Sequence, residues 1–190
     1  MTTGQALFST IPATWLAEHE ARGASTAEAW AFFDTLPAVD VHEMIGRWRG
    51  SGLPTAHPID GLLEAYGWYG KAFTSPEDVQ PLLFRHGQGN VVAFHPRRMP
   101  INLMVRHPGW LRHKAACRAF AAAAPLLRTR RPMARLRMME HRGVTSATMI
   151  YDHWPILDTF RRVNHDTLLG VMDLRDMAQP FFFVLRRHTG

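Results

Sequence analysis

Three side chains near the end of the chain could carry acid–base chemistry. Tyr151 and Asp152 are adjacent, and Asp158 follows six residues after Asp152. If a strand ends at the first two and a helical turn holds the third, all three face one mouth of a sheet. Two carboxyl groups in one apolar site push their pKa values apart, so that one stays protonated and acts as an acid. The structural alternative is that Asp152 caps a turn and Asp158 pairs with Arg161 or Arg162.

Histidine chemistry is a second possibility, because the chain holds eleven histidines. His57, which precedes Pro58, would complete an acid–base set with the carboxylates; the alternative is a turn histidine bonded to backbone. No pair has the His-x-x-x-His spacing with a third ligand that is typical of zinc sites, so we expect no metal. We also expect no cofactor, with heme kept as an alternative whose axial ligand would be His141 or His188.

Aromatic residues beside a lysine favour binding of a hydrophobic small molecule. The segment 66–71 combines three aromatic rings with hydroxyl groups and an amine. Polar tips on apolar side chains suit a ligand that needs burial and a few fixed hydrogen bonds. The alternative is that these rings pack under a sheet and that Trp48 fills the base of a barrel. The candidate binding residues are Trp48, Tyr66, Trp68, Tyr69, Lys71 and Met138.

The residues 46–52 read Gly-Arg-Trp-Arg-Gly-Ser-Gly, which predicts a strand. A period of two places Trp48 and the glycines on one face and Arg47 and Arg49 on the other. Glycines beside an indole leave room for it, and glycine in a strand permits the bend that closes a barrel. We therefore expect Trp48 to point inward.

Other elements follow from local signals. Ser25 and Glu28 form a capping box that starts a helix, which Pro37 ends. Pro155 at a first-turn position predicts a helical turn over 156–160. Helical spacing marks 110–127. Strands are expected at 80–85, 90–95, 136–141, 144–151, 168–172 and 181–187, the first two as a hairpin.

Composition points to one globular domain. The chain has 190 residues, 46% of them hydrophobic, and we expect a single domain over 1–190 in which 25–75 and 76–190 share one core. No apolar stretch is long enough to cross a bilayer, no secretory signal is recognisable, and Cys117 is the only cysteine, so a cytoplasmic protein is expected. The net charge of +6 is mostly arginine without interleaved RNA-binding aromatics, which favours no nucleic-acid partner.

The spacing of these motifs resembles a known family. Residues 46–50, 57–58 and 67–71 resemble the GXWXG-signature family of bacterial and fungal proteins of unknown function. Residues 134–138, 151–152, 169–173 and 180–185 resemble the domain that usually follows it. The first strand is also similar to that of lipocalins and of nitrobindin-like heme barrels, a fold-level analogy that does not establish function.

These observations predict an α+β protein: a curved antiparallel β-sheet that closes into a small lipocalin-like barrel or half-barrel, with flanking helices. The function expected first is binding of a hydrophobic, carbonyl-bearing small molecule in the barrel cavity. The first alternative is a cofactor-independent hydrolase, isomerase or cyclase that uses Asp, His and Tyr as acid and base. The second is a nitrobindin-like heme protein. A homodimer stays open, and no membrane partner is expected.

Overall fold

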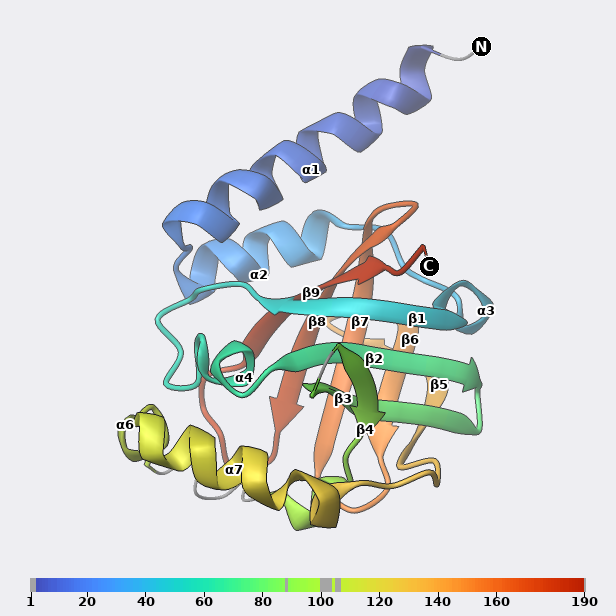
Figure 1. Cartoon of the computed structure of the whole chain (residues 1–190). Helices are drawn as coiled ribbons and strands as arrows, with labels where there is room; N and C mark the ends of the chain where they lie inside the picture. Colours follow the sequence, from blue (N-terminus) through green and yellow to red (C-terminus); the bar gives the residue numbers. More distant parts are fainter. Residues whose placement is uncertain (1–2, 88, 100–103, 105–106, 190) are drawn as a thin grey trace.

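In the part of the chain that the structure describes, nine antiparallel strands build the body of the molecule, and helices cover it on two sides (Figure 1). The computed structural model describes residues 3–87, 89–99, 104 and 107–189. The helices are α1 (Thr3–Arg22), α2 (Thr26–Thr35), α3 (Val41–Met44), α4 (Leu62–Ala65), the 3₁₀ turn η1 (Pro96–Arg98), α6 (Pro108–Leu111) and α7 (Lys114–Leu127). The strands are β1 (Gly46–Gly52), β2 (Trp68–Ser75), β3 (Asp78–His86), β4 (Asn90–Ala93), β5 (Ala134–His141), β6 (Val144–Tyr151), β7 (Ile156–Asn164), β8 (Thr167–Leu174) and β9 (Phe181–Arg187).

The strand pairings run in a ring. The order is β2-β1-β9-β8-β7-β6-β5-β3, β2 pairs back onto β3, and β4 extends the sheet beside β3. The joints differ in length: β5 and β6 pair in register over their whole length, whereas β3 and β5 share the single pair Val79–Ala134. The predicted α+β class with an antiparallel sheet is confirmed.

Local signals placed most of the elements correctly. The capping box of Ser25 and Glu28 starts α2, and a second one, Asp40 with Glu43, starts α3. The hairpin β3–β4 and the strands β5, β6, β8 and β9 lie where periodicity predicts them.

The helical turn predicted over 156–160 is wrong, because this stretch is the start of β7. Pro155 stands just before the strand, where its missing N–H costs no ladder hydrogen bond. Both β6 and β8 pair with this stretch, and pairing on two sides overrides the local helical signal.

The strands have apolar residues on both faces, and these form two separate clusters. In β9, Phe181, Phe183 and Leu185 belong to the cluster inside the ring, whereas Phe182 and Val184 belong to the cluster outside it. We call these the inner and the outer cluster. The inner cluster includes residues from before and after residue 76, from Val39 in the sequence to Leu185.

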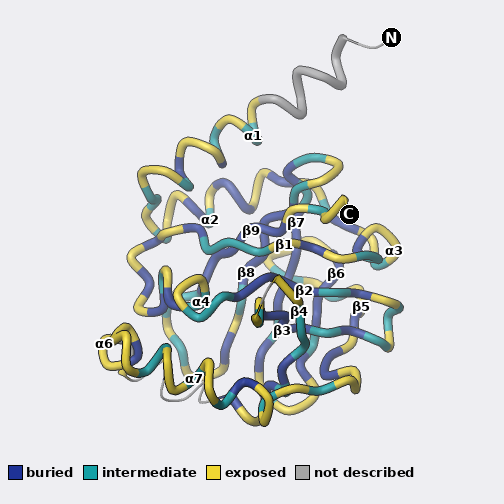
Figure 2. The backbone as a smooth tube through the Cα atoms, in the orientation of Figure 1, coloured by how far each residue is buried: buried dark blue, intermediate teal, exposed yellow. Residues whose placement is uncertain are grey.

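Helices seal the outer cluster. Leu16 of α1 and Phe32 and Phe33 of α2 pack there against β7, β8 and β9. Figure 2 shows buried residues along α2 and along the strands beside it. Phe120 of α7 packs against Phe84 and Phe94 of the inner cluster.

Among the described residues, no helix is both long and apolar enough to span a membrane.

Candidate functional site

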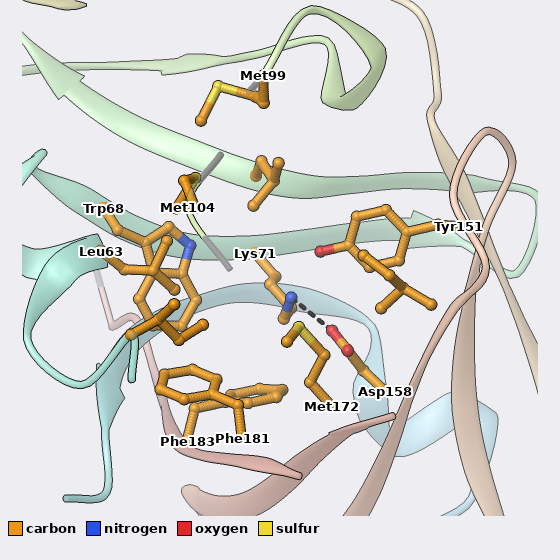
Figure 3. A pocket seen from close by; sticks show the side chains of 13 residues that line it. Leu63, Trp68, Lys71, Met99, Met104, Tyr151, Asp158, Met172, Phe181 and Phe183 are labelled. Carbon is orange, nitrogen blue, oxygen red and sulfur yellow. Dashed lines mark ion pairs between the residues drawn. The ribbon is translucent and has the colours of Figure 1, made fainter. Parts of the chain in front are cut away.

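The inner cluster encloses a cavity of about 60 Å³, enough for a few water molecules. Residues far apart in the sequence, from Ile59 to Phe183, line it (Figure 3). Almost all of the lining is apolar, and the exceptions are a lysine, an aspartate, a tyrosine hydroxyl and an indole N–H. The lining residues are Ile59, Leu63, Trp68, Lys71, Leu82, Met99, Met104, Tyr151, Ile156, Asp158, Met172, Phe181 and Phe183.

A buried ion pair forms part of the wall of this cavity. Lys71 Nζ of β2 lies 2.8 Å from Asp158 Oδ2 of β7, and the two side chains are only 3% and 1% exposed. The ammonium also donates to the carbonyl oxygen of Pro81 at 3.2 Å. Removing two charges from water costs several kcal/mol for each ion, so a pair at this depth is a specific feature of the site.

Gly70 explains how Lys71 comes to face the interior. Trp68 and Lys71 both line the cavity, although a period of two puts residues three apart on opposite faces. The pairing of β2 with β3 is irregular between Gly70 and Ala72, and Gly70 has φ +141°, a conformation that favours glycine. A Cβ at Gly70 would also overlap the backbone of Trp48. The irregularity therefore turns the lysine inward, as β-bulges do.

Aromatic rings surround the ammonium group. Lys71 Nζ lies 5.0 Å from the ring centroid of Phe183, 5.7 Å from that of Tyr151 and 5.8 Å from that of Trp68. Two glycines make room for these rings: a Cβ at Gly50 would overlap the indole of Trp68, and a Cβ at Gly170 would overlap Phe183. The signature glycine Gly50 thus clears space for the tryptophan of the neighbouring strand.

Two buried polar atoms of the site have no hydrogen-bond partner among the described residues. Asp158 Oδ1 and Trp68 Nε1 are buried without a hydrogen bond. Burial raises the pKa of Asp158, and the nearby Lys71 opposes that shift. Burial, together with the charge of Asp158, raises the pKa of Tyr151 well above its usual value, so the phenol keeps its proton at physiological pH. The site therefore offers donors from Lys71, Tyr151 and Trp68 and one acceptor from Asp158.

Comparison with known proteins matches two segments of the chain to family models. The model of the GXWXG protein family matches residues 31–89, and that of a domain of unknown function (DUF4334) matches residues 132–187. The chain belongs to the GXWXG family. It is also similar to a protein from Thermomonospora curvata with a crystal structure, at 31% identity and a TM-score of 0.68, over 93% of this chain and 98% of that chain. No curated protein matches it.

The two matched segments meet at the cavity. Trp68, Lys71 and Leu82 come from the GXWXG segment, and Tyr151, Asp158 and Phe183 from the later one. The ion pair therefore links the two parts of the family pattern.

Four of the sequence-predicted site residues are brought together here: Trp68, Lys71, Tyr151 and Asp158. Asp158 is paired with Lys71 and not with Arg161 or Arg162, since Arg161 lies on the opposite face of β7 and Arg162 reaches Glu43.

Four predicted binding residues lie outside this lining. Tyr66 lines a smaller adjoining cavity of about 20 Å³ and donates to the carbonyl oxygen of Leu111. Trp48 is fully buried as predicted, and its Nε1 donates to the carbonyl oxygen of Met44. Tyr69 contacts His188 edge-on, and Met138 is 41% exposed on β5.

The two remaining acid–base candidates are also apart from the cavity. His57 lies behind Phe181, with 5.5 Å between the ring centroids; its Nδ1 accepts from the N–H of Ile59, and its Nε2 lies 3.1 Å from the carbonyl oxygen of Gln179. Burial lowers the pKa of His57. Asp152 forms a half-exposed ion pair with Arg135.

Sequence reasoning missed the methionine and phenylalanine walls of the cavity. Met172, Phe181 and Phe183 lie on predicted strands, and the apolar run 181–185 was the signal that both faces of β9 are buried. Met99 and Met104 follow β4 in a segment with no periodic signal. Among the described residues, no three His, Cys, Asp or Glu side chains are grouped so that they could hold a metal ion.

Proposed function

We propose that the strand ring is a small lipocalin-like barrel and that its cavity binds a hydrophobic small molecule carrying a carbonyl or similar acceptor group. The observation that supports this most directly is the Lys71–Asp158 pair at the wall of an otherwise apolar cavity. Buried polar atoms without partners cost roughly 1–3 kcal/mol each. A ligand that supplies those partners recovers this free energy on binding.

The balance of donors and acceptors favours an oxygen acceptor on the ligand. Among the described lining residues, Lys71, Tyr151 and Trp68 offer N–H and O–H groups toward the cavity, whereas the unpartnered acceptor is an oxygen of Asp158. A carbonyl oxygen takes two such donors, and the apolar walls bury the rest of the molecule.

The lining also suggests how ligands of different size are accommodated. Met99, Met104 and Met172 contribute flexible, polarisable side chains that fill irregular gaps and move without strain. A cavity of about 60 Å³ suits a small ligand, and rotation of these methionines would enlarge it enough for a compound with a single ring.

A cofactor-independent acid–base enzyme is the second candidate, because Tyr151 and Asp158 line the same cavity. Asp158 would act as the base and Tyr151 as the donor to a developing oxyanion. His57 and Asp152 are left out of this version, since neither lines the cavity. Heme is not proposed, because the described lining contains no histidine and is smaller than a porphyrin.

Native mass spectrometry and thermal unfolding test the binding proposal. Protein purified from its source organism should carry a small apolar molecule, and apolar ketones, aldehydes or alcohols should raise the melting temperature of ligand-free protein. Replacing Trp68 by Phe removes the free N–H and should weaken carbonyl ligands several-fold. Trp110→Phe is the matched control, since Trp110 is 62% exposed and should change nothing. A protein that carries no ligand and is stabilised by none of these compounds would overturn the proposal.

A further inference from the structure

The amine of Lys71 at the cavity wall can act as a nucleophile, which ligand binding alone does not require. Resting on the proposed binding function, we propose that Lys71 forms a Schiff base with an aldehyde or ketone held in the cavity. Asp158 takes the proton of the lysine before the attack and returns it to the departing oxygen. The ligand class is thereby narrowed to apolar carbonyl compounds.

The choice of lysine at this position is informative. Of the 22 basic residues in the chain only Lys71 and Lys114 are lysines, and all the others are arginines. A guanidinium stays charged and is no nucleophile, whereas a buried lysine amine can lose its proton and attack a carbonyl carbon. Lys71, the cation found in the described lining of the cavity, is thus of the type that can do this chemistry.

The position of Lys71 Nζ fits a reacting group. It lies within the lining, 3% exposed as a side chain, with aromatic rings on several sides (Figure 3). Water hydrolyses imines, and an apolar enclosure limits that reverse reaction. Tyr151 extends its hydroxyl toward the same space and would hold the carbonyl oxygen as attack begins.

The reaction balances with the groups present. The ammonium of Lys71 transfers a proton to the carboxylate of Asp158, which gives a neutral amine and a carboxylic acid. The amine nitrogen bonds to the carbonyl carbon, and its proton moves to the oxygen to give a neutral carbinolamine. Asp158 then protonates the hydroxyl, which leaves as water while the nitrogen lone pair forms the C=N bond. The products are a protonated imine and the Asp158 carboxylate, with no oxidant or other reactant required.

Asp158 is suited to both parts of this exchange. One of its oxygens contacts Lys71 at 2.8 Å, and the other is buried without a partner among the described residues. Burial raises the pKa of this carboxyl, which favours its taking the proton. After the reaction the carboxylate neutralises the iminium that replaces the ammonium.

Reductive trapping on the unmodified chain tests the proposal. The protein is incubated with benzaldehyde and sodium cyanoborohydride, and the sites of benzylation are mapped by peptide mass spectrometry. Lys114 is exposed and serves as an internal control for ordinary surface amines. Lys71 should be benzylated at least about tenfold faster than Lys114, because the bound aldehyde is held beside it.

Benzyl alcohol separates the two proposals, because it has the shape of the aldehyde without an electrophilic carbon. If the alcohol raises the melting temperature but Lys71 reacts no faster than Lys114, the Schiff base is refuted and the binding function stands. If neither compound stabilises the protein and Lys71 is not benzylated, the Schiff base is refuted and the binding proposal loses support with it.

Variants locate the groups that take part. Tyr151→Phe should slow benzylation of Lys71 about tenfold, by loss of one hydrogen bond to the carbonyl oxygen. Tyr69→Phe is the matched control, since Tyr69 is equally buried but lies outside the lining, and it should react like wild type. Equal rates of Lys71 benzylation in the two variants would show that Tyr151 takes no part in the reaction.

Discussion

Two cations are buried on opposite faces of the same sheet, and their surroundings differ. Lys71 lies in the inner cluster, faces Asp158 and borders the cavity. Arg161 lies on the outer face, 1% exposed, where it donates to the carbonyl oxygen of His141 and covers the ring of Phe33 at 5.0 Å. Among the described residues no carboxylate pairs with Arg161, and its Nε and Nη1 have no hydrogen-bond partner.

The difference separates a packed outer region from the inner region that holds the candidate site. β7 sends Asp158 inward and Arg161, three residues later, outward, so one strand serves both regions. The outer region is packed around its cation by helices. The inner region keeps its cation neutralised and places it beside open space, which is the arrangement expected of a site that receives a ligand.

The same substitution at both cations should give the largest contrast. Lys71→Met leaves the charge of Asp158 buried and unpaired, which should lower the free energy of unfolding by about 3–5 kcal/mol. Arg161→Met leaves no such charge and should stay within about 1 kcal/mol of wild type. Urea unfolding followed by circular dichroism measures both. The double variant Lys71→Met/Asp158→Leu should recover most of the loss; a double variant as unstable as Lys71→Met would contradict this account.

Adjacent phenylalanines on β9 sharpen the contrast between a packed and an open region. Phe182→Ala and Phe183→Ala should each cost about 3 kcal/mol of stability, because both side chains are buried. Only Phe183 borders the cavity. A two-ring alcohol such as 2-naphthalenemethanol should therefore raise the melting temperature of Phe183→Ala and leave that of Phe182→Ala unchanged. Equal responses would show that the two sides of β9 do not differ in this way.

Substitution of the signature glycine Gly50 should have a smaller effect on stability, again within the inner cluster. Gly50→Ala places a Cβ against the indole of Trp68 and should cost about 1–3 kcal/mol by overpacking. Gly109→Ala is the control, since a Cβ there meets no atom within 4 Å. Thermal unfolding compares the two. A Gly50→Ala protein as stable as Gly109→Ala would mean that Trp68 does not need the space.

Acid should lower the free energy of unfolding by a modest amount, through one histidine beside each cluster. Burial lowers the pKa of His57 beside the inner cluster and of His141 beside the outer one. Both histidines are neutral when folded, so stability is complete above their unfolded pKa of about 6.5 and falls as pH drops below it. The loss should be on the order of 1 kcal/mol for each. Urea unfolding at pH 8 and pH 5.5 measures this loss. Between the two pH values, the free energy of unfolding of His57→Asn should fall by less than that of wild type. An equal loss in this variant would exclude His57 as a cause.

The sequence was most informative where the signal was local. Capping boxes, a hairpin and strand periodicity placed most elements, and the tryptophan of the first strand is buried as predicted. Lys71 was named as a binding residue, but its partner was not found. The pair depends on the β2–β3 pairing that closes the ring and so brings β2 and β7, which are not neighbours in the sheet, to one interior. It also depends on the irregularity at Gly70 that turns the lysine inward. Pro155 dominates the local signal around Asp158 and predicts a helical turn, whereas pairing with β6 and β8 makes this stretch a strand.

The short pairing between β3 and β5 is where we expect the ring of strands to open first. Only Val79 and Ala134 pair there, supported by backbone hydrogen bonds from Met133 to Val79 and from Leu136 to Pro76. Ala134 is also paired with the cavity residue Tyr151. Since local opening follows the smallest number of hydrogen bonds, we expect amide hydrogen exchange to be fastest along this joint. The ring of strands would then open transiently at a joint beside the cavity, and the residence time of the proposed ligand would depend on this short run of backbone.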